Sequence, residues 1–198
     1  MLASMPRRVL LIRHCQSQAN ADGRIEGKGD SPLSALGREQ ARRLAAFVAG
    51  QEIGSATLIA SPLVRAATTA AEIAVLCGWS PSHDHRIREG ELGWMEDLPY
   101  AEVGRHMAER KATVLDSELH GGESLDAVAE RLWEALSEAM TGTEDTLVFV
   151  THGYAIHALL RRLDHQLRLA LIGNGDVVEV WLEEGALAEP PRHYPLGA

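Results

Sequence analysis

The sequence predicts an α/β fold, a three-layer α/β/α sandwich with a mostly parallel central sheet. Short, continuously apolar runs, typical of strands buried on both faces, alternate with longer segments whose apolar residues recur at helical spacing. The apolar runs end abruptly in polar residues, as parallel strands do at the edge where ligands bind. The chain has 198 residues, 45% of them hydrophobic, which is enough to bury the core of one domain.

The first βα unit is predicted near the N-terminus. Residues 9–12 form an apolar, strand-like run, and the polar residues 20–32 suit a loop. Ser34 is placed to cap a helix that runs to about Gly50, because a serine hydroxyl accepts a hydrogen bond from a free amide of the first turn. Apolar residues recur on one face of this segment, so the helix should cover the sheet.

A second βα unit follows directly. Residues 57–60 predict another buried strand, and Ser61 and Pro62 suit a helix start, with the serine as cap and the proline where no amide donor is needed. This helix should continue to about Cys77 and stop at Gly78.

The middle of the chain, residues 79–121, has a less regular pattern. It predicts a short strand near residues 85–88, a loop through residue 98 and a helix over residues 100–110. We interpret this region as a cap or substrate-facing insertion.

The last third returns to regular alternation. It predicts a strand at residues 146–150, a helix at 154–163 and a strand at 177–182, preceded by a helix with a clear apolar stripe. That stripe consists of Leu125, Val128, Ala129, Leu132 and Leu136. We expect one domain over residues 1–185 and a loosely ordered tail over 186–198.

Composition excludes several classes of protein. The formal net charge is −9 and no block of Lys and Arg stands out, so a broad nucleic-acid footprint is not expected. No apolar run approaches the ~18 residues of a membrane span, and the N-terminus lacks the apolar core of a signal peptide. Cys15 and Cys77 are the only cysteines, too few for a disulfide framework. We therefore expect a cytoplasmic protein without membrane or nucleic-acid partners; the sequence leaves the oligomeric state open.

Three polar clusters follow predicted strands. Arg13 and His14 follow the first strand, residues 61–65 follow the second, and residues 151–153 follow the strand at 146–150. Because carboxyl ends of parallel strands share one edge of a sheet, we expect the three clusters to converge.

These residue types suit phosphoryl chemistry. The guanidinium forks of Arg13 and Arg65 match two phosphoryl oxygens each, and Arg65 also lies in the first turn of a helix, where an anion is favoured. His14 is able to attack phosphorus as a neutral imidazole, and His152 is able to donate to a phosphoryl oxygen. Each residue alone fits an ordinary structural role, so the common strand-end position carries the interpretation.

A departing alkoxide also needs a proton. Glu89 and Glu91 lie in the irregular middle region and are both candidate acids. Their spacing does not choose between them.

The chain resembles the histidine phosphatase superfamily, also called the phosphoglycerate-mutase-like family. Four ordered motifs carry the resemblance, which runs from Val9 to about Leu182. They are the Arg-His signature ending in Asn at residues 13–20 together with the stretch 30–37, Ser-Pro-Leu-Val-Arg at 61–65, Gly-Glu-Ser at 122–124, and Thr-His-Gly at 151–153.

The resemblance implies a phosphoglycerate-mutase-like fold and assigns roles to the residues above. His14 becomes the phosphorylated nucleophile, and Glu89 becomes the acid because it precedes Gly93 by the family spacing of four residues. The phosphate pocket consists of Arg13, Asn20, Gly27, Arg65 and His152.

The implied activity is that of a phosphomonoesterase acting on a small phosphate ester, with no metal or other cofactor. The alternative is a phosphoglycerate-type mutase, which would use the same phosphohistidine. Mutases that resemble this family are generally longer, so the compact chain favours hydrolysis. A noncatalytic phospho-ligand binder is a third reading, less favoured because binding alone would not require a proton donor.

The chain departs from the family pattern close to the nucleophile. Cys15 and Gln16 replace the usual Gly and Glu, and Glu26 stands where Gln is common before Gly27. Cys15 is not expected to act as a nucleophile, since residue 21 is Ala where a cysteine phosphatase loop would need Arg. Glu26 is expected either to repel very acidic substrates or to face solvent.

Overall fold

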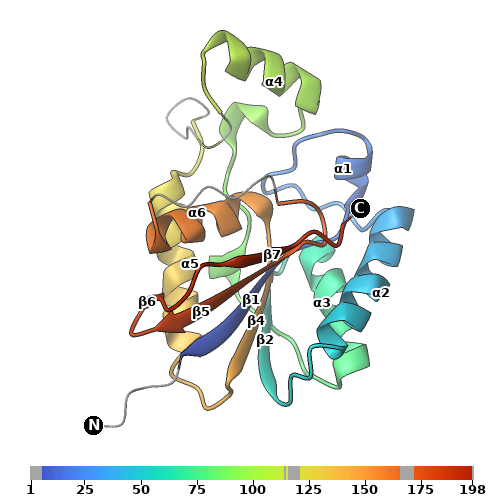
Figure 1. Cartoon of the computed structure of the whole chain (residues 1–198). Helices are drawn as coiled ribbons and strands as arrows, with labels where there is room; N and C mark the ends of the chain where they lie inside the picture. Colours follow the sequence, from blue (N-terminus) through green and yellow to red (C-terminus); the bar gives the residue numbers. More distant parts are fainter. Residues whose placement is uncertain (1–5, 114, 116–120, 166–171, 198) are drawn as a thin grey trace.

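The computed structural model describes residues 6–113, 115, 121–165 and 172–197 (Figure 1). Its sheet has the strand order β3-β2-β4-β1-β5-β6, and β7 also pairs with β5. The strands are β1 (Arg7–Arg13), β2 (Ala56–Ala60), β3 (Ser82–His83), β4 (Thr146–Thr151), β5 (Val177–Glu183), β6 (Ala186–Leu187) and β7 (Arg192–Tyr194).

Helices cover both faces of this sheet. The helices α2 and α3 lie on one face and α5 and α6 on the other, while α4 stands away from the sheet (Figure 1). The helices are α1 (Gln18–Ala21), α2 (Ala35–Ala49), α3 (Val64–Cys77), α4 (Tyr100–Glu109), α5 (Leu125–Ala139) and α6 (Gly153–Leu163), with 3₁₀ turns at His85–Ile87 and Gly93–Met95. The predicted three-layer sandwich is confirmed.

The sheet is mixed, with a parallel centre. β4 pairs in parallel with both β1 and β2, and β2 pairs in parallel with β3. β5 runs antiparallel to β1, and β6 and β7 both pair antiparallel with β5. We predicted a mostly parallel sheet; the observed sheet is mixed, with parallel pairing from β3 to β1 and antiparallel pairing from β1 to β6 and β7.

The apolar runs are continuous because each strand is buried on both faces. In β1, Val9 and Leu11 pack toward α5 and α6, whereas Leu10 and Ile12 pack toward α2 and α3. Each such side chain contributes about 1.5–3 kcal/mol when fully buried. β1 is thus firmly anchored at the point where it delivers Arg13 and His14.

The start of α2 is fixed against the chain that follows His14. Ser34 caps the helix as predicted, with its hydroxyl accepting a hydrogen bond from the Gly37 amide. A Cβ atom on Gly37 would lie 1.9 Å from the Gln16 carbonyl oxygen. Only glycine permits this close approach, which holds residues 14–17 in place.

Two predicted elements in the first half need correction. Residues 85–87 form a 3₁₀ turn capped by the Asp84 side chain, and the strand expected there lies earlier, at 82–83. The helix after β2 begins at Val64 with Leu63 as its N-cap, so Ser61 is not the cap.

The C-terminal segment also differs from the expected loose tail. Residues 186–187 and 192–194 pair with β5, which supplies their backbone hydrogen bonds. Gly197 donates its amide to Asp176 at 3.1 Å and accepts a hydrogen bond from the Gln40 side chain at 2.6 Å. These contacts fasten the segment beside the turn that precedes β5.

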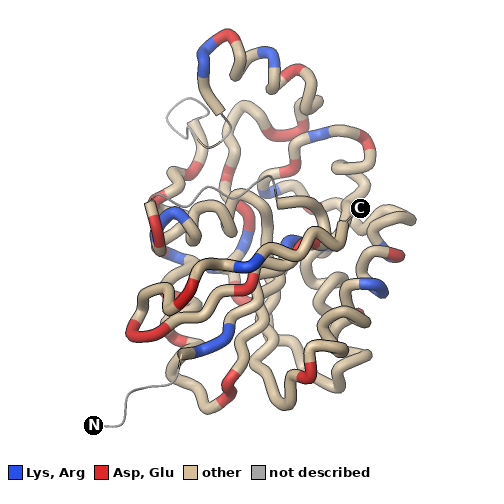
Figure 2. Tube along the Cα trace, in the orientation of Figure 1, with Lys and Arg blue, Asp and Glu red and all other residues tan. Residues whose placement is uncertain are grey.

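None of the helices in the described part of the chain combines the length and apolar composition needed to cross a membrane. Figure 2 shows basic and acidic residues interspersed along the described trace.

Candidate active site

The three polar clusters meet at the carboxyl ends of β1, β4 and β2, which are neighbouring strands. The His14 amide donates to the Thr151 carbonyl at 2.9 Å, and the Ser61 amide donates to the Val150 carbonyl at 2.9 Å. The rings of His14 and His152 lie with centroids 5.1 Å apart. The parallel register therefore brings together residues that are far apart in the sequence.

His14 is held in one tautomer. Its Nδ1 lies 2.8 Å from the Cys15 carbonyl oxygen, which only accepts, so Nδ1 carries the proton. Arg65 Nε donates to His14 Nε2 at 3.2 Å, which requires a lone pair on that nitrogen. His14 thus presents an unprotonated Nε2 to the site.

The surroundings of His14 favour its neutral form. Burial lowers the pKa of His14 well below its ordinary value, and the charges of Arg65 and Arg13 lower this pKa further. A neutral imidazole is the nucleophilic form, so the ring is ready to attack near neutral pH.

Arg65 is fully buried in the first turn of α3, as predicted for its position. Besides the contact with His14, Nη2 donates to the Gly27 carbonyl at 2.9 Å and Nη1 to the Gly29 carbonyl at 2.6 Å. The Glu26 carboxylate lies 3.4 Å from Nη1. Residues 26–29 therefore hold the guanidinium from one side while Nε faces His14.

Arg13 projects from the end of β1. Its Nη1 donates to the Ile172 carbonyl at 2.6 Å. Its Nε is buried and finds no acceptor among the described residues. A buried donor without an acceptor is costly, and an anion bound here would satisfy it.

His152 has a similar arrangement at the start of α6. Its Nε2 lies 2.8 Å from the Ser61 hydroxyl, and its buried Nδ1 has no partner in the described part of the chain. Burial lowers the pKa of His152 well below its ordinary value, and the Arg65 charge adds to this. Ser61, which we expected to cap a helix, instead orients this second histidine.

Glu89 lies buried in the loop before α4, against the N-terminus of α6. Its carboxylate accepts hydrogen bonds from the amides of Gly90 at 3.0 Å, Ala155 at 3.2 Å and Tyr154 at 3.4 Å. Burial raises the pKa of Glu89, and Arg65 and the Gly90 amide oppose that rise. A raised pKa keeps more of the carboxyl group protonated, as a general acid requires.

Glu91 differs from Glu89 in its surroundings. Its side chain is exposed, and its backbone carbonyl accepts a hydrogen bond from the Glu123 amide at 2.8 Å. The structure thus places Glu89, the residue selected by the family spacing, against the first turn of α6, which His152 caps, whereas Glu91 faces solvent.

Asn20 and Gly27, both predicted to bind phosphate, make hydrogen bonds close to His14 and Arg65. Asn20 Oδ1 accepts from Asn174 Nδ2 at 2.9 Å, and Asn174 Nδ2 also donates to the His14 carbonyl at 3.2 Å. Asn20 Nδ2 donates to the Tyr100 hydroxyl at 2.9 Å. Gly27 enters through its carbonyl contact with Arg65, so its observed role is to hold that arginine.

Cys15 is buried, and Thr69 is the polar side chain in contact with it. Its amide donates to the Thr69 hydroxyl at 3.1 Å. Burial raises the pKa of the Cys15 thiol to about 12. The thiol therefore stays protonated at neutral pH, which agrees with the expectation that it is not a nucleophile.

Sequence reasoning missed Arg131, which supports the Glu89 loop from α5. Its Nε and Nη2 donate to the Glu123 carboxylate at 2.8 and 2.9 Å, and Nη2 also donates to the Glu89 carbonyl at 3.1 Å. Its Nη1 donates to the carbonyls of Arg86 and Arg88 at 2.6 and 2.7 Å. All five guanidinium protons thus have an acceptor, an arrangement that no sequence signal distinguishes from an ordinary helix arginine.

We expect Arg131→Gln to lower the free energy of unfolding by about 2–3 kcal/mol, because it removes the guanidinium that donates to the partly buried Glu123 carboxylate and to three backbone carbonyls. kcat should fall along with it, since the backbone that carries Glu89 loses its support. Urea unfolding and steady-state kinetics measure both effects. Arg162→Gln is the matched control: Arg162 pairs with Glu130 on the surface at 2.7 Å, and its loss should cost less than about 1 kcal/mol. Equal, small effects in both variants would contradict the role of Arg131 in supporting the Glu89 loop.

Comparison with known proteins identifies the family of this chain. The family model described as histidine phosphatase superfamily (branch 1) matches residues 9–186. The chain belongs to the histidine phosphatase superfamily. The resemblance inferred from the four motifs is therefore confirmed.

Relatives within the superfamily carry names for two reactions. A probable phosphoglycerate mutase GpmB from Salmonella paratyphi C is 33% identical, with 91% of this chain and 90% of that protein covered. A mycobacterial glucosyl-3-phosphoglycerate phosphatase, solved in complex with VO3, is 28% identical at a TM-score of 0.75, with 90% of this chain and 97% of that chain covered.

A phosphoglycerate mutase from Bacillus anthracis gives a TM-score of 0.82 over 96% of this chain and 94% of that chain, at 19% identity. At that identity the likeness establishes the fold alone. This is the phosphoglycerate-mutase-like fold that we predicted from the sequence, so the fold prediction is confirmed.

Proposed function

We propose that this superfamily member is a phosphomonoesterase that works through a phosphohistidine at His14 and acts on a small phosphorylated metabolite. The observation that carries the proposal is the fixed tautomer of His14, whose unprotonated Nε2 accepts a hydrogen bond from Arg65 and lies in the field of the Arg13 charge. Two guanidinium groups at this nitrogen would stabilise the charge on a transferring phosphoryl group at every stage.

In the first step, His14 Nε2 attacks phosphorus, an N–P bond forms and the ester P–O bond breaks. Protonated Glu89 gives its proton to the departing oxygen, which leaves as an alcohol. His152 and the arginines donate hydrogen bonds to the phosphoryl oxygens.

In the second step, the Glu89 carboxylate takes a proton from water as the water oxygen attacks phosphorus. The N–P bond breaks, orthophosphate leaves and His14 is again neutral. One carboxyl group thus acts as acid and then as base, which its buried position beside the α6 amides supports.

A mutase is the second candidate, because a 33% identical relative is named a probable phosphoglycerate mutase. Its first step is the same, but an alcohol of the substrate takes the phosphoryl group back instead of water. Chain length does not separate the two reactions, since the chain covers 90% of that relative and 97% of the phosphatase structure. We favour hydrolysis because it needs only water as the second acceptor.

The two reactions are distinguished by following both products at once. A panel of sugar phosphates and phosphoglycerates should release orthophosphate, with the best substrate identified by kcat/KM. Interconversion of phosphoglycerates at a rate well above phosphate release would instead establish the mutase.

A further inference from the structure

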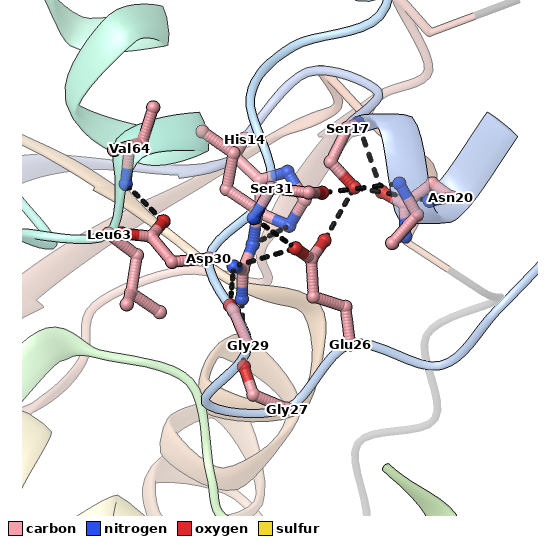
Figure 3. Close-up of polar contacts among 12 residues, drawn as sticks. His14, Ser17, Asn20, Glu26, Gly27, Gly29, Asp30, Ser31, Leu63 and Val64 are labelled. Carbon is pink, nitrogen blue, oxygen red and sulfur yellow. Dashed lines mark hydrogen bonds and ion pairs between the residues drawn. The ribbon is translucent and has the colours of Figure 1, made fainter. Parts of the chain in front are cut away.

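Glu26 is a buried acidic residue beside Arg65, one of the two arginines of the candidate site. Its side chain is 3% exposed, so the solvent-facing alternative is excluded. Figure 3 shows its carboxylate pointing toward Ser17 and Ser31. Oε2 accepts a hydrogen bond from the Ser17 hydroxyl at 2.5 Å, and Oε1 accepts one from the Ser31 amide at 2.7 Å.

The carboxylate acts on the pocket through Arg65. Glu26 Oε1 lies 3.4 Å from Arg65 Nη1, while Nε of the same guanidinium donates to His14 Nε2. A single planar group therefore connects Glu26 with the nitrogen that would carry the phosphoryl group. The negative charge of Glu26 offsets part of the positive charge that Arg65 presents to an anion.

Building on the proposed function, we propose that Glu26 sets how tightly the pocket holds phosphate, weakening the pocket's affinity for the anion and so promoting release of the orthophosphate product. The usual residue at this position, Gln, has the same shape without the charge. Glu26 is thus a tuning residue that acts through Arg65, and it does not touch the reacting atoms itself.

The effect should be similar for substrate, transition state and product, because all carry an anionic phosphoryl group at the same place. An interaction that is equal in ground and transition states changes KM without raising kcat. Unit charges separated by several ångströms at a protein-like dielectric change an anion's Kd by on the order of tenfold.

Glu26→Gln isolates the charge, because the amide keeps the hydrogen bonds. Its Oε1 is able to accept from the Ser31 amide, and its Nε2 is able to donate to the Ser17 hydroxyl. That hydroxyl already accepts from the Asn20 amide at 3.2 Å and has a second lone pair.

Titration calorimetry with inorganic phosphate tests the proposal on the full chain and needs no turnover. Glu26→Gln should lower the Kd for phosphate on the order of tenfold, and KM should fall with it while kcat does not rise. Glu39→Gln, which removes an exposed carboxylate from α2, should leave the Kd at the wild-type value. Glu26→Asp keeps the charge and should also stay close to wild type.

If Glu26 only holds Arg65 in place, Glu26→Gln should raise the Kd for phosphate, since a disordered Arg65 would bind phosphate more weakly. A Kd that rises or stays unchanged in Glu26→Gln overturns the proposal. So does equal tightening in Glu26→Asp or Glu39→Gln, or the absence of phosphate binding to the wild-type protein. Failure to form a phosphohistidine would overturn the proposed function while leaving this binding result intact.

Discussion

His14→Ala is expected to lower kcat/KM for p-nitrophenyl phosphate by on the order of 10⁴-fold, because no other group in the site replaces the attacking nitrogen. The neighbouring candidates do not compensate: the Cys15 thiol is protonated, since burial raises its pKa to about 12, and His152 Nε2 already contacts Ser61. Release of nitrophenolate, followed at saturating and at low substrate, measures the loss.

The fold should survive this change, because the strand residues before His14 anchor β1 on both faces. Circular dichroism and thermal unfolding check that expectation. His83→Ala removes an exposed histidine from β3 and should retain wild-type activity. Undiminished hydrolysis by purified His14→Ala protein would rule out the phosphohistidine mechanism.

Glu89→Gln is expected to produce the second largest loss, and the loss should depend on the leaving group. Alkyl phosphates need a proton on the departing oxygen, so their first step should slow by about 10²–10⁴-fold. Nitrophenyl phosphate needs little proton transfer in that step, so its phosphorylation of His14 should slow much less. Comparing single-turnover rates for the two ester types measures the difference.

The pH dependence should change in the same variant. In the wild type, His14 is neutral above its lowered pKa, and Glu89 is protonated below its raised pKa. Activity on alkyl esters should therefore fall as pH drops through the pKa of His14 and also fall as pH rises through that of Glu89. Glu89→Gln should lose the alkaline limb, because the group that titrates there is gone.

Glu91→Gln is the matched control for this assignment. Glu91 is exposed two residues further along the same loop, and its removal should leave both limbs and both ester types unaffected. A leaving-group-dependent loss in Glu91→Gln, with normal behaviour of Glu89→Gln, would reverse the roles of the two carboxyl groups.

The regular elements were predictable because burial on two faces leaves a clear trace in the sequence. The run at residues 9–12 is continuously apolar since alternate residues enter two different cores, and the stripe of α5 is buried in full. Convergence of Arg13, Arg65 and His152 followed from parallel strands sharing one edge. These inferences depend on patterns that repeat over many residues.

The residues that orient the site were less predictable, because they depend on single long-range contacts. Ser61 before Pro62 has the local chemistry of a helix cap, but its hydroxyl contacts His152, 91 residues away in the sequence. Arg131 and Glu26 likewise resemble ordinary charged residues of a helix and a loop. Only the tertiary structure reveals that one holds the Glu89 loop and the other faces Arg65.

The segment after residue 185 was missed for a similar reason. Its prolines and short apolar stretches resemble a tail, but β5 leaves backbone groups free for β6 and β7 to pair with. Whether a short segment pairs with the edge of a sheet depends on which strand lies beside it in the folded chain, and the residues of the segment do not specify that strand.

The central claim is that the phosphoryl group passes through His14, and trapping tests it most directly. Glu89→Gln protein mixed with p-nitrophenyl phosphate should form the phosphoenzyme and lack the base that hydrolyses it, so the intermediate should accumulate. Rapid denaturation, proteolysis and mass spectrometry should then find one acid-labile phosphoryl group on the peptide that contains His14, and none after His14→Ala. Full turnover by the wild type with the phosphoryl group on another residue, or on none, would contradict the account.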